Sequence, residues 1–223
     1  MNQFAISSLY TLEETIAKDI FNQVSYPWEV LDNIGNFILE LGSRLPLDKF
    51  DKIGEDVWIA KNANIFPSAY IHGPVIIDEE AEIRHCAFIR GNAIVGKGAV
   101  VGNSTELKNV ILFNKVQVPH YNYVGDSILG FKAHMGAGSI TSNVKSDKTL
   151  VTIKSEYGNI ETKRKKVGAM VGDNVEVGCN SVLNPGTVIG KGAQIYPLSN
   201  VRGYVEEGSI YKTAGEVVKK SES

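Results

Sequence analysis

An aliphatic residue recurs at every sixth position in the middle of the chain, and this period leaves few possible folds. The series is unbroken over Ile59, Ile65, Ile71, Ile77, Ile83, Ile89, Val95, Val101 and Leu107. A period of six fits neither an α-helix nor the simple alternation of a strand. It fits a coil of three short parallel strands, in which each hexapeptide forms one flat face and points its aliphatic residue inward. The sequence therefore predicts an all-β fold, a prism-shaped parallel β-helix.

The six-residue rhythm continues with two irregular steps and one long interruption. Two steps of five residues end at Leu112 and Leu129. The series breaks near Val144, resumes at Val171 and continues to Val201. At about 18 residues per turn, the two runs predict one β-helix of roughly six to seven turns, interrupted by a loop.

The interruption, residues 145–166, has the pattern of a β-hairpin. Thr149–Lys154 alternates with β-branched residues, Tyr157–Asn159 can form a turn, and Ile160–Thr162 can form the return strand. The returning arm ends in four basic residues, Lys163–Lys166. Such a run is usually a solvated surface, but it is also a candidate for binding phosphate.

The first 52 residues have a different pattern from the repeats. Ser8 or Thr11 can cap a helix that extends to Phe21, and apolar residues at helical spacing predict a second helix over Trp28–Leu45. We expect these helices to cover one end of the β-helix, with docking of a partner as the alternative. The predicted organisation is a helical segment at 1–52, a β-helix at 53–212 interrupted at 145–166, and a tail at 213–223.

Composition limits the remaining possibilities. The 223 residues are 43% hydrophobic and 22% charged, which is ordinary for a globular protein, and the net charge of −2 argues against nucleic acid as a partner. The two cysteines, Cys86 and Cys179, are far apart, so neither a zinc knuckle nor a disulfide framework is predicted. No apolar stretch is long enough to span a membrane, and no signal peptide is evident. We therefore expect a cytoplasmic protein.

Three segments within and beside the repeats, VGNSTELKN, PHYNYVGD and MGAGSITSN, carry a family resemblance. They resemble the acetyltransferase domain of the bifunctional N-acetylglucosamine-1-phosphate uridyltransferase/glucosamine-1-phosphate acetyltransferase and its archaeal sugar-phosphate relatives, over most of residues 83–205. The resemblance implies a left-handed β-helix, a homotrimer with sites between neighbouring subunits, and N-acetylation of an amino-sugar phosphate by acetyl-CoA without a metal. The glycine-rich L-x-x-G-x-G-T-R-M opening is absent, and 52 residues leave no room for a nucleotidyltransferase domain, so uridylyl transfer is not predicted.

The resemblance assigns two residues to the chemical step. His120 matches the catalytic base, and an imidazole suits this role because it titrates near neutral pH and an attacking amine must lose a proton. Ala137 lies between Gly136 and Gly138, at the position whose backbone N–H would stabilise the oxyanion of the tetrahedral intermediate. Asp126 matches a motif aspartate that we interpret as a turn former.

Further matching positions are assigned to the two substrates. Those for the sugar phosphate are Arg90, Glu106, Lys108, Tyr123, His134 and Asn143. Cationic groups can clamp a phosphate, while a tyrosine and a carboxylate can orient sugar hydroxyls. His134 replaces an asparagine of the family and Val144 a tyrosine, which leaves the identity of the sugar open.

The positions assigned to acetyl-CoA are Ala137, Cys179 and Pro197. Cys179 replaces a serine and can act as a weak donor, but no neighbour is evident that would activate it as a nucleophile. Pro197 replaces a small residue. We also hypothesise that the basic run Lys163–Lys166 reaches the cleft and holds the phosphates of CoA or of the sugar.

Two alternatives stay open. A zinc enzyme resembling γ-class carbonic anhydrases would use histidines at subunit interfaces, and His85 and His120 are 35 residues apart, close to two turns. That family carries an H-x-x-x-x-H pair, which this chain lacks, and zinc needs three convergent ligands. The other alternative is a non-catalytic assembly or regulatory module, motivated by the replacements at His134, Val144 and Pro197.

Overall fold

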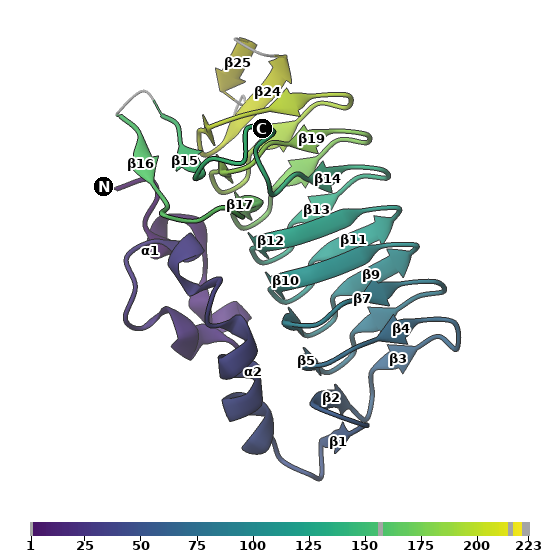
Figure 1. Cartoon of the computed structure of the whole chain (residues 1–223). Coiled ribbons are helices and arrows are strands. Elements are labelled where there is room, and N and C mark those ends of the chain that lie inside the picture. Colours follow the sequence, from purple (N-terminus) through teal and green to yellow (C-terminus); the bar gives the residue numbers. More distant parts are fainter. Residues whose placement is uncertain (1, 156–157, 214–215, 220–223) are drawn as a thin grey trace.

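The computed structural model describes residues 2–155, 158–213 and 216–219, and most of them form a parallel β-helix with three faces (Figure 1). The fold predicted from the six-residue period is confirmed. The aliphatic residues of the period point inward and are buried, as Ile77, Ile83 and Ile89 show with 0% exposure. Tyr157, part of the predicted turn, lies outside the described residues.

Each coil of the β-helix contributes one strand to each face. Face 1 contains β2 (Val57–Ala60), β5 (Val75–Ile77), β8 (Ala93–Val95), the second halves of β10 (Glu106–Leu112) and β12 (Tyr123–Leu129), β17 (Ala169–Val171), β20 (Thr187–Ile189) and β23 (Tyr204–Val205). Face 2 contains β3 (Asn64–Ile65), β6 (Glu82–Ile83), β9 (Val100–Asn103), β11 (Gln117–His120), β13 (His134–Met135), β18 (Glu176–Val177), β21 (Gln194–Ile195) and β24 (Ser209–Thr213). Face 3 contains β4 (Tyr70–Ile71), β7 (Phe88–Ile89), the first halves of β10 and β12, β14 (Ile140–Thr141), β19 (Val182–Leu183) and β22 (Asn200–Val201). We number the coils from 1 to 7 as residues 57–71, 75–89, 93–107, 110–124, 127–141, 169–183 and 187–201.

The two five-residue steps lie where the chain passes from face 3 to face 1. There β10 and β12 continue across the corner as single strands, so that the first half of β10 pairs with β7 and its second half with β8. The corner residues Asn109 and Asp126 have positive φ angles of 56° and 47°. These tight corners also bring Lys108 close to Asp126, because the two strands run parallel and in register.

Antiparallel strands close one sheet edge at each end of the stack. β1 (Phe50–Lys52) pairs with β2, and β25 (Glu216–Lys219) pairs with β24. Such pairing protects exposed edges from other chains. The sequence had not indicated a strand in the C-terminal tail.

The insertion forms the predicted hairpin, with β15 (Thr152–Ile153) antiparallel to β16 (Ile160–Glu161). It lies beside the upper coils (Figure 1). Its apolar residues Val151 and Ile153 are buried. A Cβ atom on Gly186 of the neighbouring corner would meet both side chains, at 2.8 and 3.2 Å, so this glycine makes room for the hairpin.

The N-terminal segment contains shorter helices than expected. They are α1 (Ile6–Leu9), α2 (Ile34–Ser43) and the 3₁₀ helices η1 (Leu12–Glu14), η2 (Lys18–Phe21) and η3 (Pro27–Val30). The helix predicted from Trp28 thus begins only at Ile34. Glu29 accepts hydrogen bonds from the backbone N–H groups of Ser25 and Tyr26, at 2.8 and 2.9 Å, which fixes the separate turn before it.

The expectation that this segment covers one end of the β-helix was wrong, because it covers a whole face. Helix α2 packs along β5, β8 and β10 of face 1 (Figure 1). The Tyr10 ring lies 5.1 Å from that of Phe113, and the Phe4 ring lies 5.2 Å from that of Tyr204 on β23, beyond coil 7. The outward residues of face 1 are consequently fully buried: Ile76, Ile94, Ile111, Ile128, Met170 and Val188.

Faces 2 and 3 carry no such cover from the N-terminal helices, and most of their outward residues are polar or partly exposed. Within the described ranges, no helix has the length and apolar character needed to cross a bilayer.

Candidate functional site

Four of the predicted residues form one column at the corner between faces 2 and 3. His120, Ala137, Cys179 and Pro197 occupy this corner in coils 4, 5, 6 and 7. Backbone hydrogen bonds link the corner from coil to coil: Gly138 N–H to His120 O at 3.0 Å, Asn180 N–H to Ala137 O at 2.9 Å, and Leu198 N–H to Cys179 O at 2.9 Å. The proposed base and the proposed CoA contacts therefore lie in a single line along the solenoid.

The His120 side chain is exposed, and coil 3 packs directly beneath its strand. A Cβ atom on Gly102 would collide with the carbonyl of Pro119, so only glycine allows coil 3 to pack beneath this strand. Within the described chain, the imidazole makes no hydrogen bond and is free to contact a substrate.

Asn122 is a positioning residue that the sequence did not reveal. It is 2% exposed; its Oδ1 accepts the N–H of His120 at 3.1 Å, and its Nδ2 donates to the carbonyls of Gly136 and Ser139 at 2.9 and 3.0 Å. This one amide joins the backbone on both sides of Ala137 to that of His120. A signal did exist, since Asn122 occupies the corner position that alanine, serine or threonine fills in the other coils.

The corner around Ala137 presents free backbone donors. Neither the N–H of Ala137 nor that of Cys179 donates a hydrogen bond to any described residue. A Cβ atom on Gly136 would lie 2.7 Å from the Cys179 nitrogen, so glycine is required for the two coils to approach this closely. Free N–H groups in fixed backbone can stabilise an oxyanion.

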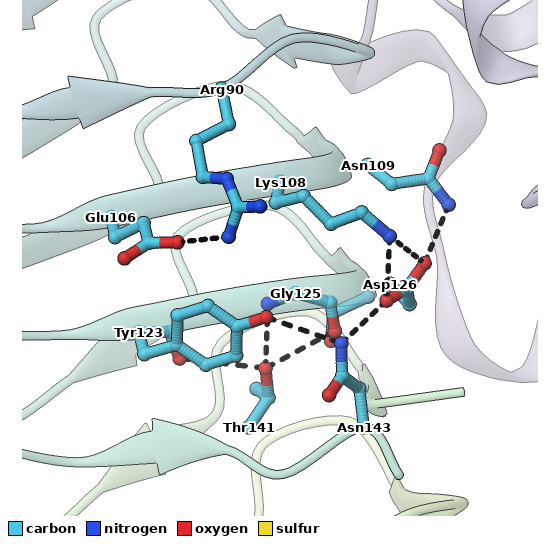
Figure 2. Close-up of polar contacts among 10 residues, drawn as sticks. Arg90, Glu106, Lys108, Asn109, Tyr123, Gly125, Asp126, Thr141 and Asn143 are labelled. Atoms are coloured by element: carbon cyan, nitrogen blue, oxygen red, sulfur yellow. Dashed lines mark hydrogen bonds and ion pairs between the residues drawn. The ribbon is translucent and has the colours of Figure 1, made fainter. Parts of the chain in front are cut away.

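A second cluster lies across face 3, at the corner with face 1 (Figure 2). The Asp126 carboxylate, 3% exposed, binds Lys108 Nζ at 2.9 and 3.1 Å and accepts from Asn109 Nδ2 at 2.9 Å and Asn143 Nδ2 at 2.6 Å. Asn143 Nδ2 also donates to the Tyr123 hydroxyl at 3.2 Å. Asp126 does occupy a tight corner, as predicted, but its carboxylate is also the centre of this network.

Tyr123 is kept in its neutral form. Burial first, and then the Asp126 carboxylate, raises the pKa of its hydroxyl above the usual value. Because the hydroxyl accepts from Asn143, its own proton remains available for a ligand. A Cβ atom on Gly125 would collide with the hydroxyl, so this glycine sets the place of the tyrosine ring.

Arg90 and Glu106 complete the cluster on the side of the lower coils. Arg90 Nη1 lies 2.7 Å from Glu106 Oε1, and Glu106 is directly in register with Tyr123 (Figure 2). The hydrogen bond to Glu106 raises the pKa of the Arg90 guanidinium further, so this exposed group is always charged. Five of the six residues predicted for the sugar phosphate are thus brought together.

The sixth, His134, lies elsewhere. It is on β13 of face 2, where its Nδ1 is 2.7 Å from Glu176 Oε2. Face 2 turns away from the cluster on face 3, so His134 would reach such a cluster only in a neighbouring copy of the chain.

The basic run lies beside the second cluster. Lys163–Lys166 lines a pocket of about 520 Å³ with Asn92, Lys108, Asn109 and Asp126 from the solenoid and Leu31 and Asp32 from the N-terminal segment. Arg164 is committed to that segment, since it pairs with Asp32 and donates to the Glu29 carbonyl at 2.9 Å. Its three lysine neighbours are exposed and form no ion pair within the described chain.

Two other features bear on cofactors. A pocket of about 460 Å³ between the hairpin and the upper coils is lined by Lys145, Lys154 and Arg202, which could hold an anionic group. Among the residues described, no group of three or more His, Cys, Asp and Glu side chains could hold a metal ion. His85 occupies the same corner as His120, two coils lower, with Asn103 between them.

Fold and site define a hexapeptide-repeat β-helix protein with an exposed histidine on one edge of face 3 and a polar cluster on the other edge. The family model described as "GMPPB C-terminal domain" matches residues 71–171. The chain is 31% identical over 206 residues to the "Bifunctional protein GlmU" of Methanococcus maripaludis, covering 91% of this chain and 50% of that protein. It is 31% identical over 167 residues to the "Bifunctional sugar-1-phosphate nucleotidylyltransferase/acetyltransferase" of Sulfurisphaera tokodaii, covering 67% of this chain and 42% of that protein.

These comparisons agree with the resemblance found in the sequence motifs: the chain resembles the hexapeptide acetyltransferase domain of such bifunctional proteins. It spans about half the length of the curated relatives it matches. Among solved structures, a hexapeptide transferase family protein from Anaplasma phagocytophilum aligns with a TM-score of 0.42 and 18% identity, covering 74% of this chain and 81% of that one. A likeness this distant supports no functional inference.

Proposed function

We propose that the protein transfers the acetyl group of acetyl-CoA to the amine of an amino-sugar phosphate. The observation that carries this proposal is the position of His120 at one edge of face 3. The column of Ala137, Cys179 and Pro197 continues above it, and the cluster around Lys108 and Asp126 lies on the other side of face 3. The donor and the acceptor can therefore approach the imidazole from opposite directions.

The chemistry needs one base and one oxyanion donor. The neutral amine of the sugar attacks the thioester carbonyl carbon, and the His120 imidazole accepts the proton that the nitrogen must lose. The backbone N–H of Ala137 would donate to the carbonyl oxygen as it becomes negative. When the C–S bond breaks, the proton passes from the imidazolium to the departing thiolate, which yields the amide and CoA.

The second cluster suits the acceptor. Arg90 and Lys108 would bind phosphate, while Tyr123, Glu106 and Asn143 would orient sugar hydroxyls. Because Asp126 holds both Lys108 and Asn143, these groups are ordered before the ligand arrives, which lowers the entropic cost of binding.

Thiol release from acetyl-CoA in the presence of a panel of amino-sugar phosphates tests the proposal. Glucosamine 1-phosphate is the first acceptor to include, with acetylated product identified by mass spectrometry. Absence of acceptor-dependent thiol release across the panel would count against acetyl transfer.

We also propose a homotrimer. Since the N-terminal segment covers face 1, faces 2 and 3 are left for subunit contacts, and packing face 2 of one copy against face 3 of the next gives a ring that can close. This arrangement would bring His134 of one copy toward the cluster of another. Light scattering should give three times the chain mass at micromolar concentration, and a stable monomer would contradict the ring.

The basic run supports a further prediction, that it binds the phosphate of the acceptor. Lys163, Lys165 and Lys166 share a pocket with Lys108, whereas the CoA column lies at another corner. Changing the three lysines to glutamine should raise the KM for the acceptor several-fold and weaken its salt dependence, with the KM for acetyl-CoA unchanged.

Arg164 is left unchanged in this variant because it holds the N-terminal segment. The matched control changes Lys115, Lys132 and Lys191 to glutamine, three lysines at the corner between faces 1 and 2. Identical acceptor KM values for the two triple variants and the parent protein, at low and high salt, would show that the run is only a solvated surface.

A further inference from the structure

Two large aromatic side chains point outward from face 3, below the acceptor cluster. Tyr70 on β4 is 64% exposed and Phe88 on β7 is 40% exposed. Their ring centroids are 5.8 Å apart with planes inclined by 58°. Exposed aromatic residues in contact with each other on the surface of a sheet often mark a binding surface.

These aromatic residues are continuous with the proposed site. Phe88 is in register with Glu106, and Glu106 with Tyr123, so that all four side chains form one column over coils 1 to 4. The three steps from Tyr70 to Tyr123 span about 14 Å at the usual strand spacing.

A second column, which contains two cationic residues, runs beside the aromatic one. Its members follow the residues of the aromatic column by two positions in successive coils: His72, Arg90 and Lys108. The same ladder of backbone hydrogen bonds joins them. The Arg90 guanidinium carbon is 6.0 Å from the centre of the Phe88 ring. Face 3 thus offers an aromatic surface beside the cationic side chains of Arg90 and Lys108, and aromatic and cationic groups side by side are the combination that binds a base and its phosphates.

We propose that the acceptor is a nucleotide-linked amino sugar rather than a sugar monophosphate. This inference rests on the proposed function. The amino sugar would lie at His120 and Tyr123, the diphosphate along Arg90 and Lys108, and the base on Phe88 and Tyr70.

The positions of the proposed CoA contacts and of the aromatic column support this choice of ligand. The proposed CoA contacts occupy coils 5 to 7, so an acceptor that extends along face 3 away from them passes toward coils 2 and 1. That is where Phe88 and Tyr70 lie. A monophosphate would be satisfied at Arg90 and Lys108 and would leave both rings without a role.

Binding of nucleotides, measured by calorimetry on the full chain, tests the proposal without relying on transfer activity. We expect UDP or GDP to bind at least tenfold more tightly than ribose 5-phosphate, which has no base. Phe88→Ala and Tyr70→Ala should each weaken binding of the nucleotide about tenfold, as expected for loss of a stacked base, and leave ribose 5-phosphate binding unchanged.

Phe131→Ala is the matched control. Phe131 also lies beside cationic groups, with Lys132 Nζ and Lys115 Nζ 5.0 and 6.0 Å from its ring centre, but at the corner between faces 1 and 2. Nucleotide binding in this variant should equal that of the parent protein.

Equal affinity for ribose 5-phosphate and both nucleotides would overturn the proposal. Unchanged nucleotide affinity in Phe88→Ala and Tyr70→Ala would also overturn it. If these variants then lose the oligomer as well, the two rings belong to a subunit contact. If nucleotides bind as expected but no amino sugar is acetylated, the proposed function fails while the nucleotide site stands.

Discussion

Replacing His120 with alanine should lower turnover on the order of 100-fold or more, because general base catalysis typically contributes that much. The imidazole is exposed, lies at the edge of face 3, and is adjacent in the stack to the free N–H of Ala137. Its removal leaves the corner column above it and the cluster around Asp126 intact. The binding of acetyl-CoA, measured by calorimetry, should therefore change little, while thiol release in saturating substrates falls.

His85→Ala provides the matched control. His85 occupies the same corner two coils lower and is also exposed, with its Nδ1 2.9 Å from the Ser68 hydroxyl. This variant should keep the turnover of the parent protein. Full activity in His120→Ala would end the assignment of the base. Loss of parent activity on chelation, together with loss in both histidine variants, would favour the zinc-enzyme alternative.

The solenoid was predictable because its interior repeats at a fixed interval. Each inward residue, such as Ile77 or Ile83, meets the same surroundings in every coil, and so the same residue type recurs. The hairpin was predictable from local alternation and turn residues. The five-residue steps at Leu112 and Leu129 were visible too, but their meaning required the structure, which shows single strands continuing across the corner.

The burial of face 1 under the N-terminal segment also corresponds to a sequence pattern, which recurs once per coil rather than every six residues. Ile76, Ile94 and Ile111 each stand immediately before an inward aliphatic residue, and they recur once per coil. On face 2 the corresponding residues are mostly polar, such as Glu82 and Gln117, and on face 3 they are partly exposed. An outward residue that is apolar in every third repeat indicates a covered face, but the identity of the covering segment depends on contacts between residues far apart in the chain.

The sequence named the candidate groups of the proposed site but not the residues that hold them in place. His120 and Ala137 belong to two of the motif segments, PHYNYVGD and MGAGSITSN, and the structure places them in adjacent coils. Asp126 and Asn122 act through partners that are 14 to 18 residues away, in neighbouring coils. Such partnerships follow from the register between coils, which the six-residue period alone does not fix.

The buried outward residues of face 1 make the covering segment a large contributor to stability. Ile111 is 0% exposed and stands in register between Ile94 and Ile128, beneath the N-terminal helices. Ile111→Ala should lower the free energy of unfolding by about 2–5 kcal/mol, because the change removes buried surface and leaves a cavity. Chemical denaturation followed by circular dichroism measures this loss.

Ile140→Ala separates the effect of the cover from that of the solenoid. Ile140 is also an outward isoleucine on a strand, but it lies on face 3 and is partly exposed. Its replacement should cost less than about 1 kcal/mol, since a partly solvated side chain loses less surface and leaves no closed cavity. Equal losses in the two variants would mean that the N-terminal segment does not pack stably on face 1 in solution. A large difference would also imply that face 1 is closed to subunit contacts, because a face already buried within the chain has no apolar surface left for a partner.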